Sequence, residues 1–126
     1  MTQIVDHVRG GLAHVRYVTT GSGIIANAQP FARGSEGNPE FTLAFNGNIM
    51  NYHALLKELS KDGWKPKTNV DTEVITELIA RGMEKARKGE PSIVAGIKYA
   101  MSKLQGAYSA GVFTRSGETI AFRDFL

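Results

Sequence analysis

The chain has 126 residues, of which 42% are hydrophobic and 21% are charged, a composition that argues against disorder and predicts one globular domain spanning residues 1–126. Its net charge of +3 comes from scattered basic residues, and the densest group, Arg81 to Lys88, contains Glu84, so we expect no nucleic-acid partner. No apolar run approaches the roughly 20 residues that span a bilayer and no signal peptide is recognisable, so we expect no membrane partner and a cytoplasmic protein.

The first part of the chain predicts strands. Residues Leu12 to Val18 alternate in character and include β-branched and aromatic side chains, as a strand does. This alternation places Leu12, His14, Arg16 and Val18 on one face of the strand. The composition of Gly34 to Glu40 predicts a surface loop, and Phe41 to Phe45 is a second short strand that ends at Asn46-Gly47.

Three helices are predicted next. The first runs from about Tyr52 to Lys61, where apolar residues recur at helical spacing, and Gly63 suits the position after its end. The second begins near Asp71, a favourable N-cap residue. The third runs from about Pro91 to Leu104, with proline in its first turn and Gly106 just past its end.

The last part of the chain predicts a hairpin. Its strands are Ala107 to Phe113 and Thr119 to Arg123, and Ser116-Gly117 marks the turn between them. The order of strands, helices and strands predicts an α+β domain with helices packed on one face of a mainly antiparallel sheet.

Cysteine is absent, which removes disulfides, thiolate metal sites and thiol catalysis. The histidines His7, His14 and His53 have no serine or carboxylate at a recognisable triad spacing, and no His-x-x-x-His pair occurs. We therefore expect no metal site and no cofactor.

Two places in the sequence carry groups suited to binding a polar ligand. Arg16 has a planar guanidinium that matches a carboxylate, although a strand arginine can also serve in a surface ion pair. Asn46-Gly47 can supply a side-chain donor beside a backbone N–H, which is the chemistry that stabilises an oxyanion. The alternative for Asn46-Gly47 is a tight turn, in which this dipeptide is common.

Four segments occur in a characteristic order: His-Val-Arg-Tyr-Val-Thr-Thr-Gly (14–21), Asn-Ala-Gln-Pro-Phe (27–31), Asn-Gly-Asn-Ile (46–49) and Asp-Thr-Glu-Val-Ile (71–75). Together they resemble the glutaminase domain of class II glutamine amidotransferases, and most closely its amidophosphoribosyltransferase branch. The segments 106–109 and 121–124 also look like this family. The resemblance implies part of the N-terminal-nucleophile hydrolase fold, a four-layer αββα sandwich.

The resemblance also implies roles for individual residues. Arg16 would hold the α-carboxylate of glutamine, Thr19 would contact the substrate, and Asp71 would meet the α-amino group. Asn46 and Gly47 would form the oxyanion hole. Alternatives remain open for Thr19 and Asp71 as well, since Thr19 also suits a turn before Gly21 and Asp71 suits a simple helix N-cap, a role that can coexist with substrate contact.

The chain departs from the family pattern in two respects. The N-terminal cysteine that attacks the glutamine amide is missing, since no cysteine occurs and only thirteen residues precede His14. Phe45 stands where the family usually has histidine. Gln29 fits the amidophosphoribosyltransferase branch, whereas the glucosamine 6-phosphate branch more often has histidine at this position.

The expected function is therefore that of a partial glutamine amidotransferase domain, similar to the one used in purine nucleotide biosynthesis. It would keep the glutamine-binding and oxyanion residues but would be inactive as a glutaminase alone. The alternatives are a non-catalytic glutamine-sensing or protein-interaction module and one half of a split glutaminase. Because strands of the family fold are missing, we also expect a homo-oligomer or a partner chain that supplies them.

Overall fold

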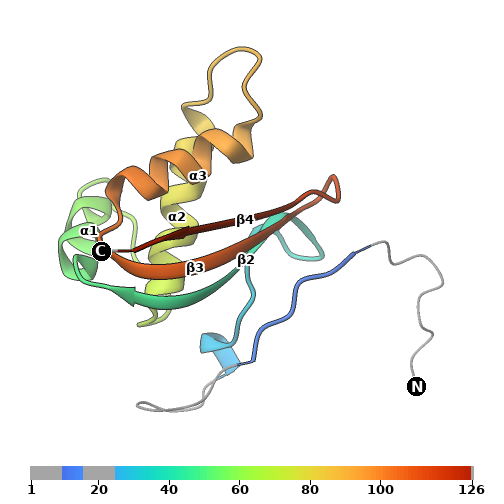
Figure 1. The fold of residues 1–126 in the computed structure, drawn as a ribbon. Helices are drawn as coiled ribbons and strands as arrows, with labels where there is room; N and C mark the ends of the chain where they lie inside the picture. Colours follow the sequence, from blue (N-terminus) through green and yellow to red (C-terminus); the bar gives the residue numbers. More distant parts are fainter. Residues whose placement is uncertain (1–9, 16–24, 126) are drawn as a thin grey trace.

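A computed structural model describes residues 10–15 and 25–125. Within these residues the chain forms a four-stranded antiparallel sheet and three α-helices (Figure 1). The strands are β1 (Phe31–Ser35), β2 (Asn38–Ile49), β3 (Gly106–Thr114) and β4 (Thr119–Asp124), adjacent in that order. The helices are α1 (Tyr52–Ser60), α2 (Asp71–Glu84) and α3 (Ser92–Lys103), and a 3-10 turn, Ile25–Asn27, precedes β1.

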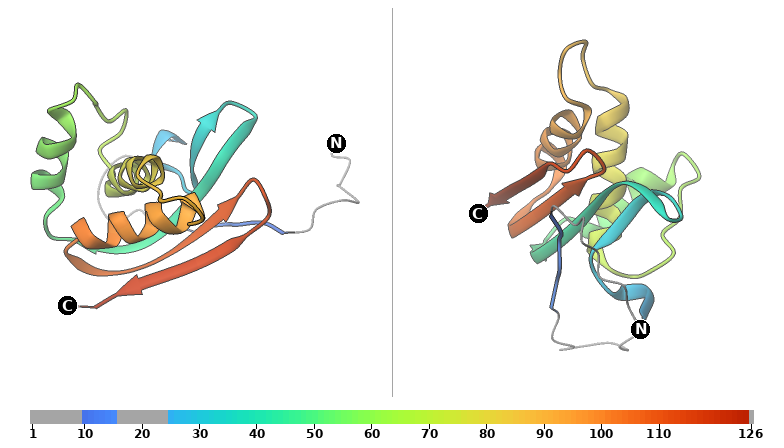
Figure 2. Two further views of the ribbon diagram at one scale, coloured as in Figure 1. Left: turned by 90° about the horizontal axis from the view of Figure 1, so that it is seen from above. Right: turned by 90° about the vertical axis from the view of Figure 1, so that its right-hand side faces the viewer.

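One face of the sheet is covered by the helices. Side chains alternate across each strand, so that the register Leu43↔Val112 and Phe45↔Ala110 places these four residues on the helix side, where all are buried. From α2 and α3, Ile75, Ile79 and Ile97 pack into the same core. Figure 2 shows the two helices lying over the strands when the sheet is viewed from above. The core thus lies between one sheet and one layer of helices.

Helices α2 and α3 approach each other through two glycines. A Cβ atom on Gly96 would lie 2.5 Å from the carbonyl oxygen of Ile79, and one on Gly82 would lie 2.8 Å from the Cα of Gly96. Larger residues at either position would separate the helices. The GIKYAMSK segment of α3 therefore supplies the glycine that lets α3 cross close to α2, in addition to apolar residues that face the core.

The other face of the sheet carries mostly small side chains. On β2, β3 and β4, alternation places Ala44, Ser109, Gly111, Phe113 and Ala121 on this side, which we call the open face. Residues 10–15 run across it, because Leu12 Cδ1 lies 3.4 Å from where a Cβ of Gly111 would be and the Phe113 ring lies beside Gly10. Figure 1 shows this segment on the side of the sheet away from α2 and α3.

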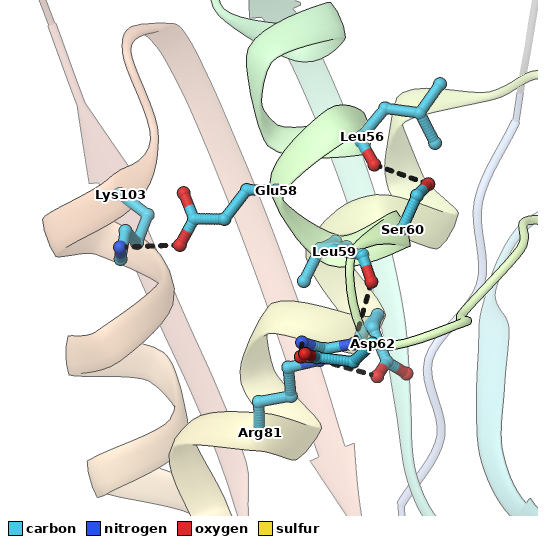
Figure 3. A network of polar contacts seen from close by, with 8 residues as sticks. Leu56, Glu58, Leu59, Ser60, Asp62, Arg81 and Lys103 are labelled. Carbon is cyan, nitrogen blue, oxygen red and sulfur yellow. Dashed lines mark hydrogen bonds and ion pairs between the residues drawn. The ribbon is translucent and has the colours of Figure 1, made fainter.

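Polar contacts join the C-terminal parts of the three helices to one another (Figure 3). The Arg81 guanidinium of α2 donates to the Asp62 carboxylate at 2.6 Å and to the Leu59 carbonyl oxygen at 3.2 Å, and Lys103 of α3 pairs with Glu58 of α1 at 2.8 Å. Arg81 also pairs with the buried Glu77 at 2.9 Å. These contacts hold α1 in place together with its buried Leu55 and Leu59, which pack into the core.

The predicted fold class and the positions of the helices are confirmed. The domain is α+β, helices lie on one face of an antiparallel sheet, and α1, α2 and α3 each begin and end within one residue of the predicted bounds where these were given. The turn at Ser116-Gly117 is also present, where the Gly117 N–H donates to the Thr114 carbonyl oxygen at 3.0 Å. The described residues account for one helix layer and one sheet of the αββα arrangement.

Several details of the sequence prediction are wrong. Leu12 to Val15, the described part of the first predicted strand, is not in a strand, because it lies across the face of the sheet rather than pairing with an edge. The loop predicted over Gly34 to Glu40 shrinks to a turn at Glu36-Gly37, since β1 and β2 run into it. Asp71 is not the N-cap of α2: Val70 holds that position in an extended conformation.

The start of α2 has a physical reason. The Glu73 carboxylate accepts hydrogen bonds from the backbone N–H groups of Lys67 and Thr68 and from the Thr68 hydroxyl, at 2.6–2.8 Å. These bonds hold the preceding loop against the first turn of the helix. The loop therefore reaches the helix with Val70 extended, and Asp71 becomes the first helical residue.

Candidate functional site

A cavity of about 630 Å³ lies beside the last part of β2, beyond the point where β1 begins to pair with it. Four parts of the chain form its walls: residues 13–15, Gln29, the β2 edge around Asn46, and the start of α2. The described lining residues are Ala13, His14, Val15, Gln29, Phe45, Asn46, Gly47, Val70, Asp71 and Thr72. The cavity thus gathers segments that lie far apart in the sequence.

Asn46 and Gly47 are held in β2 by pairing with β3. Their partners are Ser109 and Tyr108. Gly47 has a φ of 156°, and a Cβ atom on it would lie 2.5 Å from both the Ala107 carbonyl oxygen and the Tyr108 Cβ. Only glycine allows the two strands to approach this closely. The alternative of a tight turn is not present here. The prediction that the second strand covers Phe41 to Phe45 and ends at Asn46-Gly47 is also wrong, because β2 begins at Asn38 and continues through both residues to Ile49.

Asp71 and Thr72 come to the cavity from the first turn of α2. The helix N-terminus carries a partial positive charge that favours the Asp71 carboxylate at this end. Burial raises the pKa of the nearby Tyr52, and the negative charges of Asp71 and Glu73 raise it further. Thr72 is fully buried, and its hydroxyl has no hydrogen-bond partner in the structure among the residues described.

Phe45, which precedes Asn46-Gly47 where the family usually has a polar histidine, packs into the apolar core. Its side chain is 4% exposed and packs against the Tyr108 ring with the ring centroids 5.8 Å apart. Because it is on the helix side of β2, it extends the apolar core rather than offering a polar group to the cavity. Burial raises the pKa of Tyr108, and the nearby Asp124 carboxylate raises it further.

Gln29 and Thr72 are polar cavity residues that were not predicted as site residues. In the sequence Gln29 is a marker of the family branch, yet its side-chain oxygen accepts a hydrogen bond from the Phe45 backbone N–H at 2.6 Å. Thr72 received no role, although it follows Asp71 directly. The signal for Gln29 was its place in the Asn-Ala-Gln-Pro-Phe segment, whereas nothing in the sequence marked the burial of Thr72.

The structure brings together three of the five predicted site residues, Asn46, Gly47 and Asp71, around the cavity. The other two, Arg16 and Thr19, lie outside the described residues. The segment that leads to Arg16 reaches the site, because Ala13, His14 and Val15 line the cavity. The Nδ1 atom of His14 is buried, and no described residue forms a hydrogen bond with it.

The described part of the chain shows no group of three or more histidine, aspartate or glutamate side chains that could hold a metal ion. Nor does any helix in residues 10–15 and 25–125 have the length and apolar character needed to cross a bilayer.

Comparison with known proteins then defines the family. A family model described as a glutamine amidotransferase domain matches residues 14–126. The chain belongs to this family. The match contains the cavity residues from His14 to Thr72, so the glutamine amidotransferase domain includes the candidate site.

Relatives come from two kinds of amidotransferase. The chain is 35% identical to the amidophosphoribosyltransferase of Bacillus subtilis over 113 residues, 90% of this chain and 22% of the relative. It is 41% identical to a chloroplastic amidophosphoribosyltransferase of Arabidopsis thaliana, over 95% of this chain and 20% of the relative. It is 37% identical to a glutamine–fructose-6-phosphate aminotransferase of Francisella tularensis, over 90% of this chain and 17% of the relative. The glutamine amidotransferase domain seen here thus spans about a fifth of these relatives.

Solved structures show the same likeness. The domain matches the B. subtilis glutamine phosphoribosylpyrophosphate amidotransferase, solved with ADP and GMP, with a TM-score of 0.70 and 34% sequence identity, over 88% of this chain and 22% of that one. A structure titled as the allosteric regulatory enzyme of purine biosynthesis matches with a TM-score of 0.73 and 37% identity, over the same shares. The sheet and helices described above therefore have the fold of a glutamine amidotransferase domain.

Proposed function

We propose that the cavity binds L-glutamine. Asp71 would meet the α-ammonium group through a charge-assisted hydrogen bond, while the Asn46 side chain and the Gly47 backbone N–H would face the side-chain carboxamide. The observation that carries this proposal is the convergence of Asn46, Gly47 and Asp71 on one cavity from separate elements. Arg16 and Thr19 remain in the proposal as the contacts to the α-carboxylate and the substrate.

The proposed chemistry is binding and polarisation of the amide without its hydrolysis. Two N–H donors near the carboxamide oxygen would stabilise negative charge on that oxygen, a contribution whose removal typically costs about 10²–10³ in rate. Hydrolysis also requires a nucleophile, and the 126 residues contain no cysteine. Asn46 and Gly47 would therefore serve as a preformed oxyanion site that awaits a thiol from elsewhere.

The wider role is an amidophosphoribosyltransferase-like one in purine nucleotide biosynthesis. Similarity to two amidophosphoribosyltransferases and the residue Gln29 favour it over the fructose-6-phosphate branch. The second candidate is one half of a split glutaminase, or a module that senses glutamine. The absence of cysteine from this sequence favours both over independent catalysis.

Calorimetric titration with L-glutamine, run beside an ammonia-release assay, tests the proposal. We expect heat of binding and no ammonia from the purified chain. Asp71→Asn and Arg16→Ala should each lower the affinity at least about tenfold, because each removes one charge-assisted contact to the amino acid. Asp62→Asn is the matched control, since its carboxylate pairs with Arg81 away from the cavity. Absence of glutamine binding would refute the proposal, and ammonia release would refute its claim of inactivity.

A further inference from the structure

Beside the candidate site, a side chain of the residues before β1 takes the place of a backbone hydrogen-bond acceptor for β2. Strands β1 and β2 pair as far as Phe31↔Leu43, and continuing this register would place residue 29 opposite Phe45. The backbone of residue 29 is not part of that ladder. Instead, the Phe45 N–H donates to the side-chain oxygen of Gln29 at 2.6 Å. Gln29 thus takes the place of the strand that would otherwise accept this hydrogen bond.

This hydrogen bond lies next to the two proposed donors. Phe45 immediately precedes Asn46 and Gly47, and Gln29 lines the same cavity as both. On the other side of β2, these residues are fixed by pairing with Ser109 and Tyr108 and by the close approach of Gly47 to Ala107. On the cavity side, the Gln29 oxygen is the contact that holds the backbone at Phe45.

The chemistry requires the amide oxygen of Gln29 in this contact. A backbone N–H can bond only to an acceptor, so the oxygen must face Phe45 and the NH₂ end must point elsewhere. An unpaired N–H in the nearly fully buried Phe45 would be unfavourable, so the side chain is held in one orientation. An apolar residue of the same length would leave the N–H unsatisfied and allow this stretch of β2 to shift.

We propose that Gln29 is a positioning residue for the Asn46–Gly47 donor pair, acting through the backbone of Phe45. Its role in glutamine affinity rests on the proposed function of the cavity. Its effect on the β2 backbone does not, and can be measured in the free protein.

Two variants separate the acceptor from the size of the side chain. Gln29→Met keeps the length and removes the acceptor, whereas Gln29→Glu keeps an oxygen facing Phe45. Arg115→Met is the matched control, because Arg115 donates to the carbonyl oxygens of Asn38 and Pro39 at the opposite end of β2. Amide hydrogen exchange by NMR would report on Phe45 and Asn46, and calorimetry would report on glutamine affinity.

We expect Gln29→Met to speed exchange at Phe45 and at Asn46 and to weaken glutamine binding, each by about tenfold, as for the loss of one buried hydrogen bond. Gln29→Glu should restore the slow exchange, and Arg115→Met should leave both the exchange and the affinity unchanged. A Gln29→Met variant that loses protection at Phe45 alone, with unchanged Asn46 exchange and affinity, would show a purely structural bond and overturn the proposal.

The two proposals fail in different ways. If the unmodified chain does not bind glutamine, the proposed function fails, and the exchange at Asn46 alone then decides the role of Gln29. Faster exchange there in Gln29→Met but not in Arg115→Met would support positioning. Equal exchange in all variants would exclude it.

Discussion

Gly47 lies where β2 passes close to β3, and this closeness predicts the effect of adding a single methyl group. In Gly47→Ala the new Cβ would lie 2.5 Å from the Ala107 carbonyl oxygen, at a φ of 156°. The strands would have to separate, which should lower the free energy of unfolding by about 3 kcal/mol. Urea unfolding would measure this loss. Asn46→Ala, at the exposed neighbouring position, should stay within about 0.5 kcal/mol of the unmodified protein, and equal stabilities of the two variants would contradict the explanation.

Tyr108 predicts how stability depends on alkaline pH. Its hydroxyl is buried and bonds to no described residue, and burial together with Asp124 raises its pKa. A tyrosine with a raised folded-state pKa contributes stability below its unfolded value of about 10, and this contribution is lost as the pH rises through the folded pKa. Stability should therefore fall above about pH 10, and fall less in Tyr108→Phe.

Thermal unfolding at a series of pH values would test this prediction. At neutral pH, Tyr108→Phe should keep or slightly increase the melting temperature, because it removes a buried hydroxyl without a described partner. Tyr52, whose pKa is also raised, should account for part of the remaining alkaline loss. Identical pH profiles for Tyr108→Phe and the unmodified chain would show that Tyr108 does not control the effect.

At the scale of elements, the crossing of α2 and α3 depends on Gly96. A methyl group there would lie 2.5 Å from the Ile79 carbonyl oxygen, and the gain in helix propensity from Gly to Ala, about 1 kcal/mol, would not offset the overlap. We expect Gly96→Ala to lower the free energy of unfolding by about 2 kcal/mol. Denaturant titration would measure it, with Ser102→Ala on the exposed side of α3 as the control. A more stable Gly96→Ala would show that propensity outweighs the crossing.

The elements also show what the sequence can and cannot predict. Helices α1, α2 and α3 were predictable because each carries an apolar stripe at helical spacing, and such local patterns survive folding. Strand β1 was missed because its sequence, Phe-Ala-Arg-Gly-Ser, has a bulge at Arg33/Gly34 and no alternating apolar run. Of the site, Asn46, Gly47 and Asp71 were found through motifs, whereas the bond from Phe45 to Gln29 depends on a strand register that no local pattern contains.

At the scale of the whole molecule, the open face offers a surface for association. Mostly small side chains on β2, β3 and β4 form it, and residues 10–15 cross it, from which Val15 projects with 88% of its surface exposed. Phe125, 67% exposed, lies beside Arg123 near the same face. When two sheets pack face to face, the side chains of their inner faces interdigitate and form a core between them. We therefore expect the chain to associate through this face, with itself or with a partner chain.

Sedimentation velocity over a range of concentrations would test self-association. The sedimentation coefficient should rise with concentration for the unmodified chain. Ala121→Glu places a charge on the exposed open-face side of β4 and should keep the chain monomeric, because burying an unpaired carboxylate in an interface is costly. Ser102→Glu adds the same charge on the helix side and should behave like the unmodified chain. A compact monomer at every concentration would exclude self-association and leave a partner chain as the remaining way to cover the open face.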